Sequence, residues 1–210
     1  MKQIAVGFDT VVWGINSANQ IFRFNPGTQN WDRIPGLLVQ VAVGANGDVW
    51  GINADQQIYR FNPQTQNWNL IPGLLAQLSV GADGTVWGIN AAQEIHRFNP
   101  QTQNWDSIPG RLMQIAVGSH TVVWGINSAD EIFRFNPGTQ NWEQVPGLLA
   151  QITVGADGAV WGLNSASYIY HFNHQTQNWD GITGQLKTIA VGADQAVWGI
   201  NSLHYIFRFR

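Results

Sequence analysis

A five-residue element, V-W-G-[IL]-N, occurs six times in this chain, and its tryptophans are 37 residues apart each time. The six tryptophans are Trp13, Trp50, Trp87, Trp124, Trp161 and Trp198. A fixed period of this length is the signature of a repeat architecture. Neighbouring repeats should therefore present nearly the same surface, which predicts several equivalent sites rather than one unique site.

Composition excludes several classes of partner. Charged residues make up only 11% of the chain, the net charge is −3, and the ten basic residues are scattered, which argues against nucleic acid. No apolar run approaches the ~18 residues that span a bilayer, so we expect no membrane insertion. Met1 leads directly into the first repeat without a signal peptide, so we expect a cytoplasmic or non-classically secreted protein.

Each repeat is predicted to contain four strands. The first reads K-Q-I-A-V-G, V-V-W-G-I-N, Q-I-F-R-F-N and N-W-D-R-I-P-G, and each segment is rich in β-branched or aromatic residues and bounded by turn formers. No stretch has a 3.6-residue apolar period, so no helix is expected. The predicted fold is all-β: a six-bladed β-propeller of four-stranded antiparallel blades, one domain over residues 1–210. A linear solenoid is less consistent, because both ends are ordinary repeats rather than caps.

Turn symmetry predicts the register within a blade. A symmetric third turn pairs Phe24 with Trp31 and Arg23 with Asp32, and a symmetric second turn then pairs Trp13 with Arg23. The polar pair recurs as Arg60/Asn69, Arg97/Asp106, Arg134/Glu143 and His171/Asp180. Asn16 and its five equivalents are expected to cap the second turn.

The sixth repeat is incomplete. The chain ends without an equivalent of residues 174–185, which contain the third turn, the outer strand and the P-G turn of the fifth repeat. The sixth blade should therefore have three strands, end at residues 206–209 and lack an outer tryptophan. Because an unpaired strand edge invites strand addition, we expect this edge to support a homodimer or to accept a segment of a longer parent chain.

The string W-x-x-[IV]-P-G-x-L-x-Q-[IVL]-x-V-G-x-x-x-x-V-W-G-[IL]-N spans four repeats, beginning at Trp31, Trp68, Trp105 and Trp142. It closely resembles the tectonin repeat, and a fifth copy departs with Thr183 for Pro and Thr188 for Gln. The resemblance implies a six-bladed β-propeller lectin. Relatives in this family include horseshoe-crab tachylectin-1, fish-egg lectins and fungal tectonins, which bind bacterial surface glycans, lipopolysaccharide or O-methylated sugars. Other family members are intracellular adaptors.

Three sets of side chains are candidate carbohydrate ligands. The first is the outer tryptophans, whose rings could stack on a sugar or staple against a third-strand phenylalanine: Trp31, Trp68, Trp105, Trp142 and Trp179. The second is the basic third-strand position, which suits either a sugar hydroxyl or a cross-strand ion pair: Arg23, Arg60, Arg97, Arg134 and His171. The third is the asparagine of T-Q-N, where turn hydrogen bonds are the alternative: Asn30, Asn67, Asn104, Asn141 and Asn178. The inner tryptophans, such as Trp13, are expected to form core between blades.

No enzymatic signature is present. The five histidines are His96, His120, His171, His174 and His204, and none has a metal-ligand spacing. Turn geometry accounts for the Asp-Gly and Asn-Gly pairs, which have no calcium-loop spacing. We therefore expect no catalysis, cofactor or metal.

The predicted function is that of a multivalent lectin that binds glycans or glycoconjugates weakly at repeated sites. The alternative is a protein-interaction scaffold, or an idealised repeat propeller without a dedicated ligand. A lectin requires polar and aromatic groups kept in every copy, whereas a scaffold requires one differentiated surface.

Overall fold

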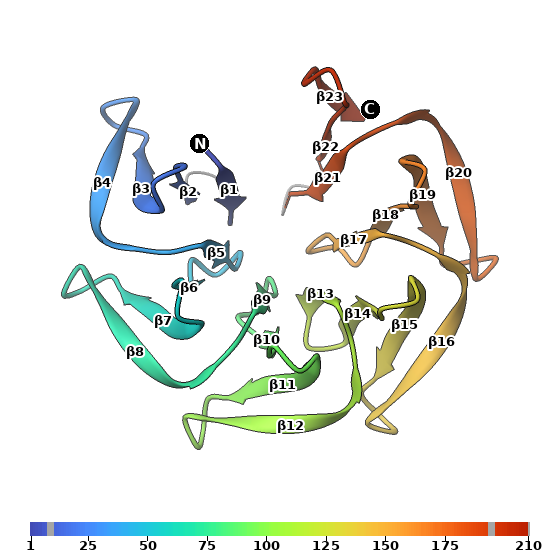
Figure 1. Cartoon of the computed structure of the whole chain (residues 1–210), viewed down its shortest axis with the longest axis horizontal. Helices are drawn as coiled ribbons and strands as arrows, with labels where there is room; N and C mark the ends of the chain where they lie inside the picture. The colour runs from blue at the N-terminus through green and yellow to red at the C-terminus, as the bar shows by residue number, and fades with distance from the viewer. Residues whose placement is uncertain (8–10, 193–195, 210) are drawn as a thin grey trace. The chain divides into compact units, whose positions relative to one another are not determined.

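The chain folds into six antiparallel sheets (Figure 1). The computed structural model describes residues 1–7, 11–192 and 196–209, and within these ranges it contains 23 strands and no helix. Five sheets have four strands, the last has three, and in each the strands pair in chain order. We number these sheets as blades one to six. The predicted all-β, six-bladed propeller class is thus confirmed, including the three-stranded sixth blade.

The strands of the first three blades follow the repeat. Blade one comprises β1 (Gln3–Val6), β2 (Val12–Ile15), β3 (Gln20–Asn25) and β4 (Asn30–Leu37). Blade two comprises β5 (Gln40–Val43), β6 (Val49–Ile52), β7 (Gln57–Asn62) and β8 (Asn67–Leu74). Blade three comprises β9 (Gln77–Val80), β10 (Val86–Ile89), β11 (Glu94–Asn99) and β12 (Asn104–Arg111).

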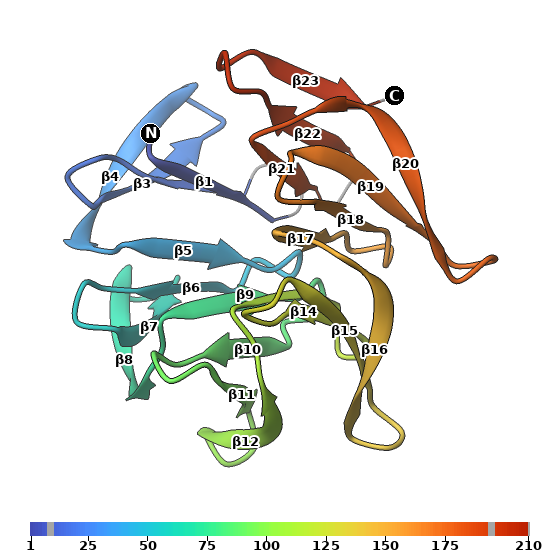
Figure 2. The ribbon, with the colours of Figure 1, turned by 45° about the vertical axis from the view of Figure 1, so that its right-hand side comes forward.

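The last three blades repeat the same order. Blade four comprises β13 (Gln114–Ser119), β14 (Val122–Ile126), β15 (Glu131–Asn136) and β16 (Asn141–Leu148). Blade five comprises β17 (Gln151–Val154), β18 (Val160–Leu163), β19 (Tyr168–Asn173) and β20 (Asn178–Gln185). Blade six comprises β21 (Thr188–Val191), β22 (Val197–Ile200) and β23 (Ile206–Phe209), which lie side by side in Figure 2. The chain divides into two compact units, Met1–Ile108 and Pro109–Arg210, which are described separately.

The register within the blades matches the prediction from turn symmetry. Phe24 pairs with Trp31, Arg23 pairs with Asp32, and Trp13 pairs with Arg23. Asn16 caps the second turn, because its side-chain oxygen accepts hydrogen bonds from the backbone N–H groups of Ala18 and Gln20. The same two bonds recur in every blade, which confirms the role expected for this asparagine.

Apolar clusters lie between consecutive blades of one unit. One joins Trp13, Ile15 and Ile21 of blade one to Val41 and Phe61 of blade two. Equivalent clusters join blades two and three, four and five, and five and six. The inner tryptophans at 13, 50, 87, 124 and 161 are at most 6% exposed, which confirms the core role expected for them, whereas Trp198 of blade six is 47% exposed.

A glutamine at the start of the first strand clamps the next blade. The side chain of Gln3 donates to the carbonyl of Val41 and accepts from its N–H, both at 3.0 Å. The same paired bonds join Gln40 to Leu78, Gln114 to Ile152 and Gln151 to Ile189. The recurring glutamine of the repeat is thereby explained as a bridge between first strands. Blade six has Thr188 at this position.

The glycine of V-W-G is required by a leucine that lies against it. A Cβ atom on Gly88 would overlap Cδ1 of Leu75 and would lie 3.0 Å from the carbonyl oxygen of Gln77. The same overlap occurs between Gly51 and Leu38 and at the equivalent positions of blades four to six. In blade one, Met1 fills the place of this leucine, with its sulfur 3.2 Å from the Cβ position of Gly14.

We predict that Gly88→Ala lowers the free energy of unfolding by about 1–3 kcal/mol, because the added methyl group overpacks a buried site. Urea titration followed by tryptophan fluorescence measures this loss. Gly27→Ala is the matched control: its Cβ would meet only the side-chain oxygen of Asn25, at 3.4 Å, so little change is expected. Adding Leu75→Ala to Gly88→Ala should relieve part of the overlap, so the double variant should lose less free energy of unfolding than the two single variants lose in sum. Losses that simply add would contradict this explanation.

Candidate functional site

The third turn of each complete blade is held by its own side chains. The side-chain oxygen of Asn25 accepts hydrogen bonds from the N–H groups of Gly27 and Thr28, and Gln29, at a φ of 56°, donates to the carbonyl of Pro26. The equivalents Gln66, Gln103, Gln140 and Gln177 make the same bond to residue 63, 100, 137 or 174. Turn hydrogen bonds therefore account for the recurrence of glutamine in T-Q-N.

The candidate asparagines lie on the exposed side of these turns. Asn30 and Asn104 donate to the carbonyls of Thr28 and Thr102, whereas the side chain of Asn178 accepts from the N–H of Trp179. Asn67 and Asn141 are also exposed. Their side chains stand at the rim of the blade, at the start of the outer strand.

Three of the outer tryptophans join consecutive blades. Each of the five packs edge-to-face against the third-strand phenylalanine of its own blade, with ring centroids 5.2–5.5 Å apart. Trp68 also packs on Trp13 of the preceding blade, Trp105 packs on Trp50, and Trp179 packs on Trp124, at 5.7–6.2 Å. The contact with phenylalanine is the one predicted from the sequence as the alternative to stacking on a sugar. The second contact, with an inner tryptophan, extends this aromatic packing across the blade boundary.

Trp31 differs from the other outer tryptophans. It is 37% exposed, whereas Trp68, Trp105, Trp142 and Trp179 are half-buried. Trp105 in addition donates its indole N–H to the carbonyl of Pro72 at 2.9 Å. Gly73 has a positive φ, +112°, and a Cβ atom at this position would lie 3.2 Å from the Trp105 ring.

We predict that Trp105→Ala lowers the free energy of unfolding by about 3 kcal/mol, because it opens a cavity beside Trp50 and Phe98 and removes a hydrogen bond. Trp31→Ala should cause a clearly smaller loss, because that ring is more exposed and packs on Phe24. Urea titration of the two variants compares them. Equal losses would contradict the stapling role assigned to the second contact.

The basic third-strand residues lie over the inner tryptophans. The guanidinium carbon of Arg23 is 5.9 Å from the centroid of the Trp13 ring, and Arg60, Arg97 and Arg134 lie at 5.5–5.9 Å from Trp50, Trp87 and Trp124. A cation over an indole face is attracted by the ring quadrupole. The arginine therefore holds a planar set of N–H donors beside an aromatic surface in each of blades one to four.

The carboxylate partner of the arginine varies between blades. The expected cross-strand ion pair forms between Arg134 and Glu143 at 2.9 Å and between Arg97 and Asp106 at 3.5 Å. Arg60 faces neutral Asn69 across the sheet and instead makes two hydrogen bonds, of 2.8 and 3.0 Å, to Asp48. Asp48 occurs only in the second repeat, so reasoning from the repeat pattern missed this pair.

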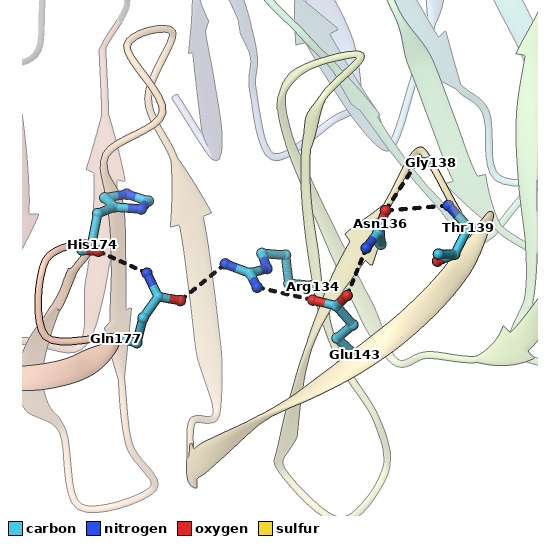
Figure 3. A network of polar contacts seen from close by, with 7 residues as sticks. All are labelled: Arg134, Asn136, Gly138, Thr139, Glu143, His174 and Gln177. Atoms are coloured by element: carbon cyan, nitrogen blue, oxygen red, sulfur yellow. Dashed lines mark hydrogen bonds and ion pairs between the residues drawn. The ribbon is translucent and has the colours of Figure 1, made fainter.

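A polar network links blades four and five (Figure 3). Arg134 donates to Glu143 of its own strand pair and, at 3.2 Å, to the side-chain oxygen of Gln177 in the next blade. Asn136 donates to the other carboxylate oxygen of Glu143 at 2.7 Å. The hydrogen bonds from Asn136 and Arg134 hold the pKa of Glu143 below its usual range. In blade one, Arg23 donates likewise to Gln66, while Asn25 donates to Asp32.

The polar side chains of blade one line a groove of about 380 Å³ between blades one and two. Its walls include Trp13, Phe61, Arg23, Asp32 and Asn25. The groove thus places a cation, a carboxylate and an amide beside the half-buried ring of Phe24, above the buried rings of Trp13 and Phe61, which suits a ligand that carries hydroxyl groups. Of the predicted ligand groups, the structure brings Arg23 into this groove, while Asn30 and Trp31 lie outside its lining.

Asn25 and Trp13 of the groove were not predicted as ligand groups. The available signal for Asn25 was the N-P or N-H step that opens each third turn, and Trp13 was expected in the core, where it also belongs. Within the described ranges, no three His, Asp or Glu side chains gather as metal ligands, and no helix is long and apolar enough to cross a membrane.

Blade five replaces the arginine with His171, whose ring lies 4.5 Å from that of Trp161. Burial lowers the pKa of His171, and the charge of His174 acts in the same direction, whereas Asp180 and Asp157 oppose the shift. His171 is therefore predominantly neutral at pH 7, and blade five lacks the cation that blades one to four carry.

We predict that NMR titration of the imidazole signals gives His171 a pKa below 6.5. Asp180→Asn should lower this pKa further, because the carboxylate stabilises the protonated ring. Asp106→Asn, the same change in blade three, is the matched control and should leave it unchanged. A pKa above 6.5 in the unmodified chain would contradict the dominance of burial.

The family model described as the tectonin domain matches residues 1–176 and 135–210. The chain belongs to the tectonin family. No curated protein matches it significantly. Similar solved structures include human WBSCR16, at 10% identity and a TM-score of 0.76 over 99% of this chain and 77% of that one. The WD40 propeller domain of Doa1 is similar at 10% identity and a TM-score of 0.75, over 98% of this chain and 78% of that one.

A third similar structure is YCF48 bound to D1 peptide, at 15% identity and a TM-score of 0.68 over 98% of this chain and 76% of that one. At these identities the structural matches establish the propeller fold alone. The tectonin assignment therefore rests on the repeat sequence, and the fold on the sequence and structure together.

Proposed function

We propose that this tectonin protein is a non-enzymatic, multivalent lectin that binds glycans or glycoconjugates in the grooves between adjacent blades. The observation that carries the proposal is the arginine that lies over an inner tryptophan in blades one to four. A pyranose has an apolar C–H face and a rim of hydroxyl groups, and the groove between blades one and two offers N–H donors with carboxylate and amide acceptors beside the half-buried ring of Phe24.

The groove between blades one and two supports this assignment in detail. Arg23 makes its hydrogen bond to the neutral side chain of Gln66, at 3.2 Å, while Asp32 receives a bond from Asn25. A guanidinium has five N–H donors, so Arg23 retains donors for a sugar hydroxyl or an anionic glycan group. Trp68 packs on Trp13 across this blade boundary and so helps to hold the two blades together.

Weak binding at each groove is compatible with strong binding to a glycan-coated surface. Once one groove is occupied, a second glycan on the same surface meets a neighbouring groove at high effective concentration. Bacterial surface glycans and O-methylated sugars, the ligands of tectonin lectins, are the proposed targets. Nucleic acid is a poor candidate, because the chain has only ten basic residues against thirteen acidic ones and a net charge of −3.

We predict that a glycan array that includes lipopolysaccharides identifies a ligand, and that calorimetry with that ligand gives several equivalent weak sites per chain. Replacing together the four arginines that lie over inner tryptophans, as Arg23→Gln, Arg60→Gln, Arg97→Gln and Arg134→Gln, should reduce binding at least tenfold, because the charged donors are lost. Circular dichroism and urea titration test whether the variant remains folded.

Arg33→Gln is the matched control, since Arg33 is exposed on the outer strand of blade one and should not affect binding. A single tight site, or no response across the array, would contradict the lectin proposal. One tight protein ligand would instead support the scaffold alternative. If the quadruple variant is unfolded, Arg23→Gln alone tests the groove between blades one and two, where a loss equal to that of Arg33→Gln would refute it.

A further inference from the structure

The arginines that lie over the inner tryptophans of blades one and two differ in what their N–H groups contact. Both blades belong to the unit Met1–Ile108. Arg60 donates from Nε and Nη2 to the two carboxylate oxygens of Asp48, at 2.8 and 3.0 Å. Arg23 donates from Nη1 to Gln66, and within the described residues it makes no other hydrogen bond or ion pair. The edge formed by Nε and Nη2 is therefore occupied in blade two and free in blade one.

The first turn of the blade carries the residue that makes this difference. Val11 in blade one and Asp48 in blade two occupy the same position of the repeat. The carbonyl of each accepts a hydrogen bond from the N–H of the glycine four residues earlier, at 2.9 Å in both blades. The backbone is thus placed alike, and Val11 lines the groove between blades one and two without a group that could pair with Arg23.

The pair of Asp48 with Arg60 leaves few donors for a ligand. Two parallel hydrogen bonds between a guanidinium and a carboxylate form a strong and geometrically specific charged pair. The side chain of Asp48 is 14% exposed, against 40% and 42% for Asp106 and Glu143, which meet their arginines from the outer strand. The side chain of Arg60 is 41% exposed, so pairing rather than burial keeps its N–H groups from other acceptors.

The groove between blades one and two keeps both a donor edge and an acceptor. Asp32 faces Arg23 across the strand pair and lines the same groove, and one of its carboxylate oxygens accepts from Asn25 at 2.9 Å. The free edge of Arg23 can donate two hydrogen bonds, and the other oxygen of Asp32 can accept one. Two neighbouring hydroxyl groups of a neutral sugar match this arrangement, whereas the charge of Asp32 would repel an anionic group.

We propose that Asp48 is an internal ligand that closes the glycan site at the boundary between blades two and three. The groove between blades one and two is the open form of the same site, and it takes a pair of neighbouring hydroxyl groups of a neutral glycan. This role of Asp48 rests on the proposed lectin function. The carboxylate of Asp48 holds the edge of Arg60 that those hydroxyl groups contact on Arg23. One boundary is thereby removed from the set of repeated sites, although its tryptophan and arginine are kept.

The first test measures which guanidinium groups are available and needs no glycan. The folded chain is modified with p-hydroxyphenylglyoxal, an arginine reagent, and the rate at each arginine is read by peptide mapping with mass spectrometry. Arg23 should react roughly tenfold faster than Arg60, because the pair with Asp48 protects the latter. Asp48→Val, which gives blade two the residue of blade one, should raise the rate at Arg60 to that at Arg23. Asp55→Val, the same change at an exposed aspartate of blade two, is the matched control and should leave the rate at Arg60 unchanged.

Val11→Asp makes the opposite exchange. It should slow the reaction of Arg23 roughly tenfold and leave that of Arg60 as it was, because the new carboxylate stands where Asp48 stands in blade two. Urea titration tests whether this variant is folded, and if it is not, Asp48→Val decides alone. Equal rates at Arg23 and Arg60 in the unmodified chain, or an unchanged rate at Arg60 in Asp48→Val, would overturn the closure of this site by Asp48.

The second test compares glycan binding by the same chains on an array of neutral and acidic glycans. With the neutral glycan that gives the strongest signal, calorimetry should find one more site per chain in Asp48→Val and one fewer in Val11→Asp. An unchanged number of sites in Asp48→Val would overturn the proposal, and binding confined to acidic glycans would overturn the assignment of a hydroxyl pair. Silence across the array, with the arginine rates as expected, would refute the lectin function and the glycan role of Asp48 while leaving its pair with Arg60 established, so the two failures are distinguishable.

Discussion

Edge-to-face packing of aromatic rings between consecutive blades is the interaction on which the rest of each unit depends. An inner tryptophan meets the third-strand phenylalanine and the outer tryptophan of the next blade, as Trp13 meets Phe61 and Trp68. Each ring in such a cluster buries a large area, and the T-shaped geometry adds to the attraction. A single blade has only polar turns and a thin sheet, so the apolar interior of the protein consists of these boundaries.

The aromatic boundary also determines where polar groups can lie. Because Trp13 is covered by rings from blade two, the arginine over its remaining surface stands at the mouth of a groove rather than in the core. The third turn of the next blade then supplies a glutamine that accepts a hydrogen bond from the arginine: Gln66 from Arg23, and Gln177 from Arg134. A ligand in the groove would therefore contact two blades, and the structural and binding roles of this position are not exclusive.

The sequence was sufficient to predict the contents of a blade. The period gave the number of blades, turn symmetry gave pairs such as Phe24 with Trp31, and the absent segment gave the three-stranded sixth blade. Contacts between blades were harder to predict from the sequence, because the residue pattern within one repeat does not indicate which side chains of the neighbouring blade it contacts. The second partner of Trp68, the clamp made by Gln3 and the seating of Met1 over Gly14 all belong to this class. The pair of Arg60 with Asp48 depends on a residue found in one repeat alone.

The glutamine clamp gives the molecule a direction. Gln3 holds Val41, and Gln40 holds Leu78, so each clamping side chain precedes the strand that it holds by 38 residues. During synthesis, a finished blade therefore already presents the donor and acceptor that the following blade requires. Since these contacts never span more than two repeats within a unit, the chain can acquire structure one blade at a time behind the ribosome. A pause in translation would leave a short stack of ordered blades rather than a chain waiting for its far end.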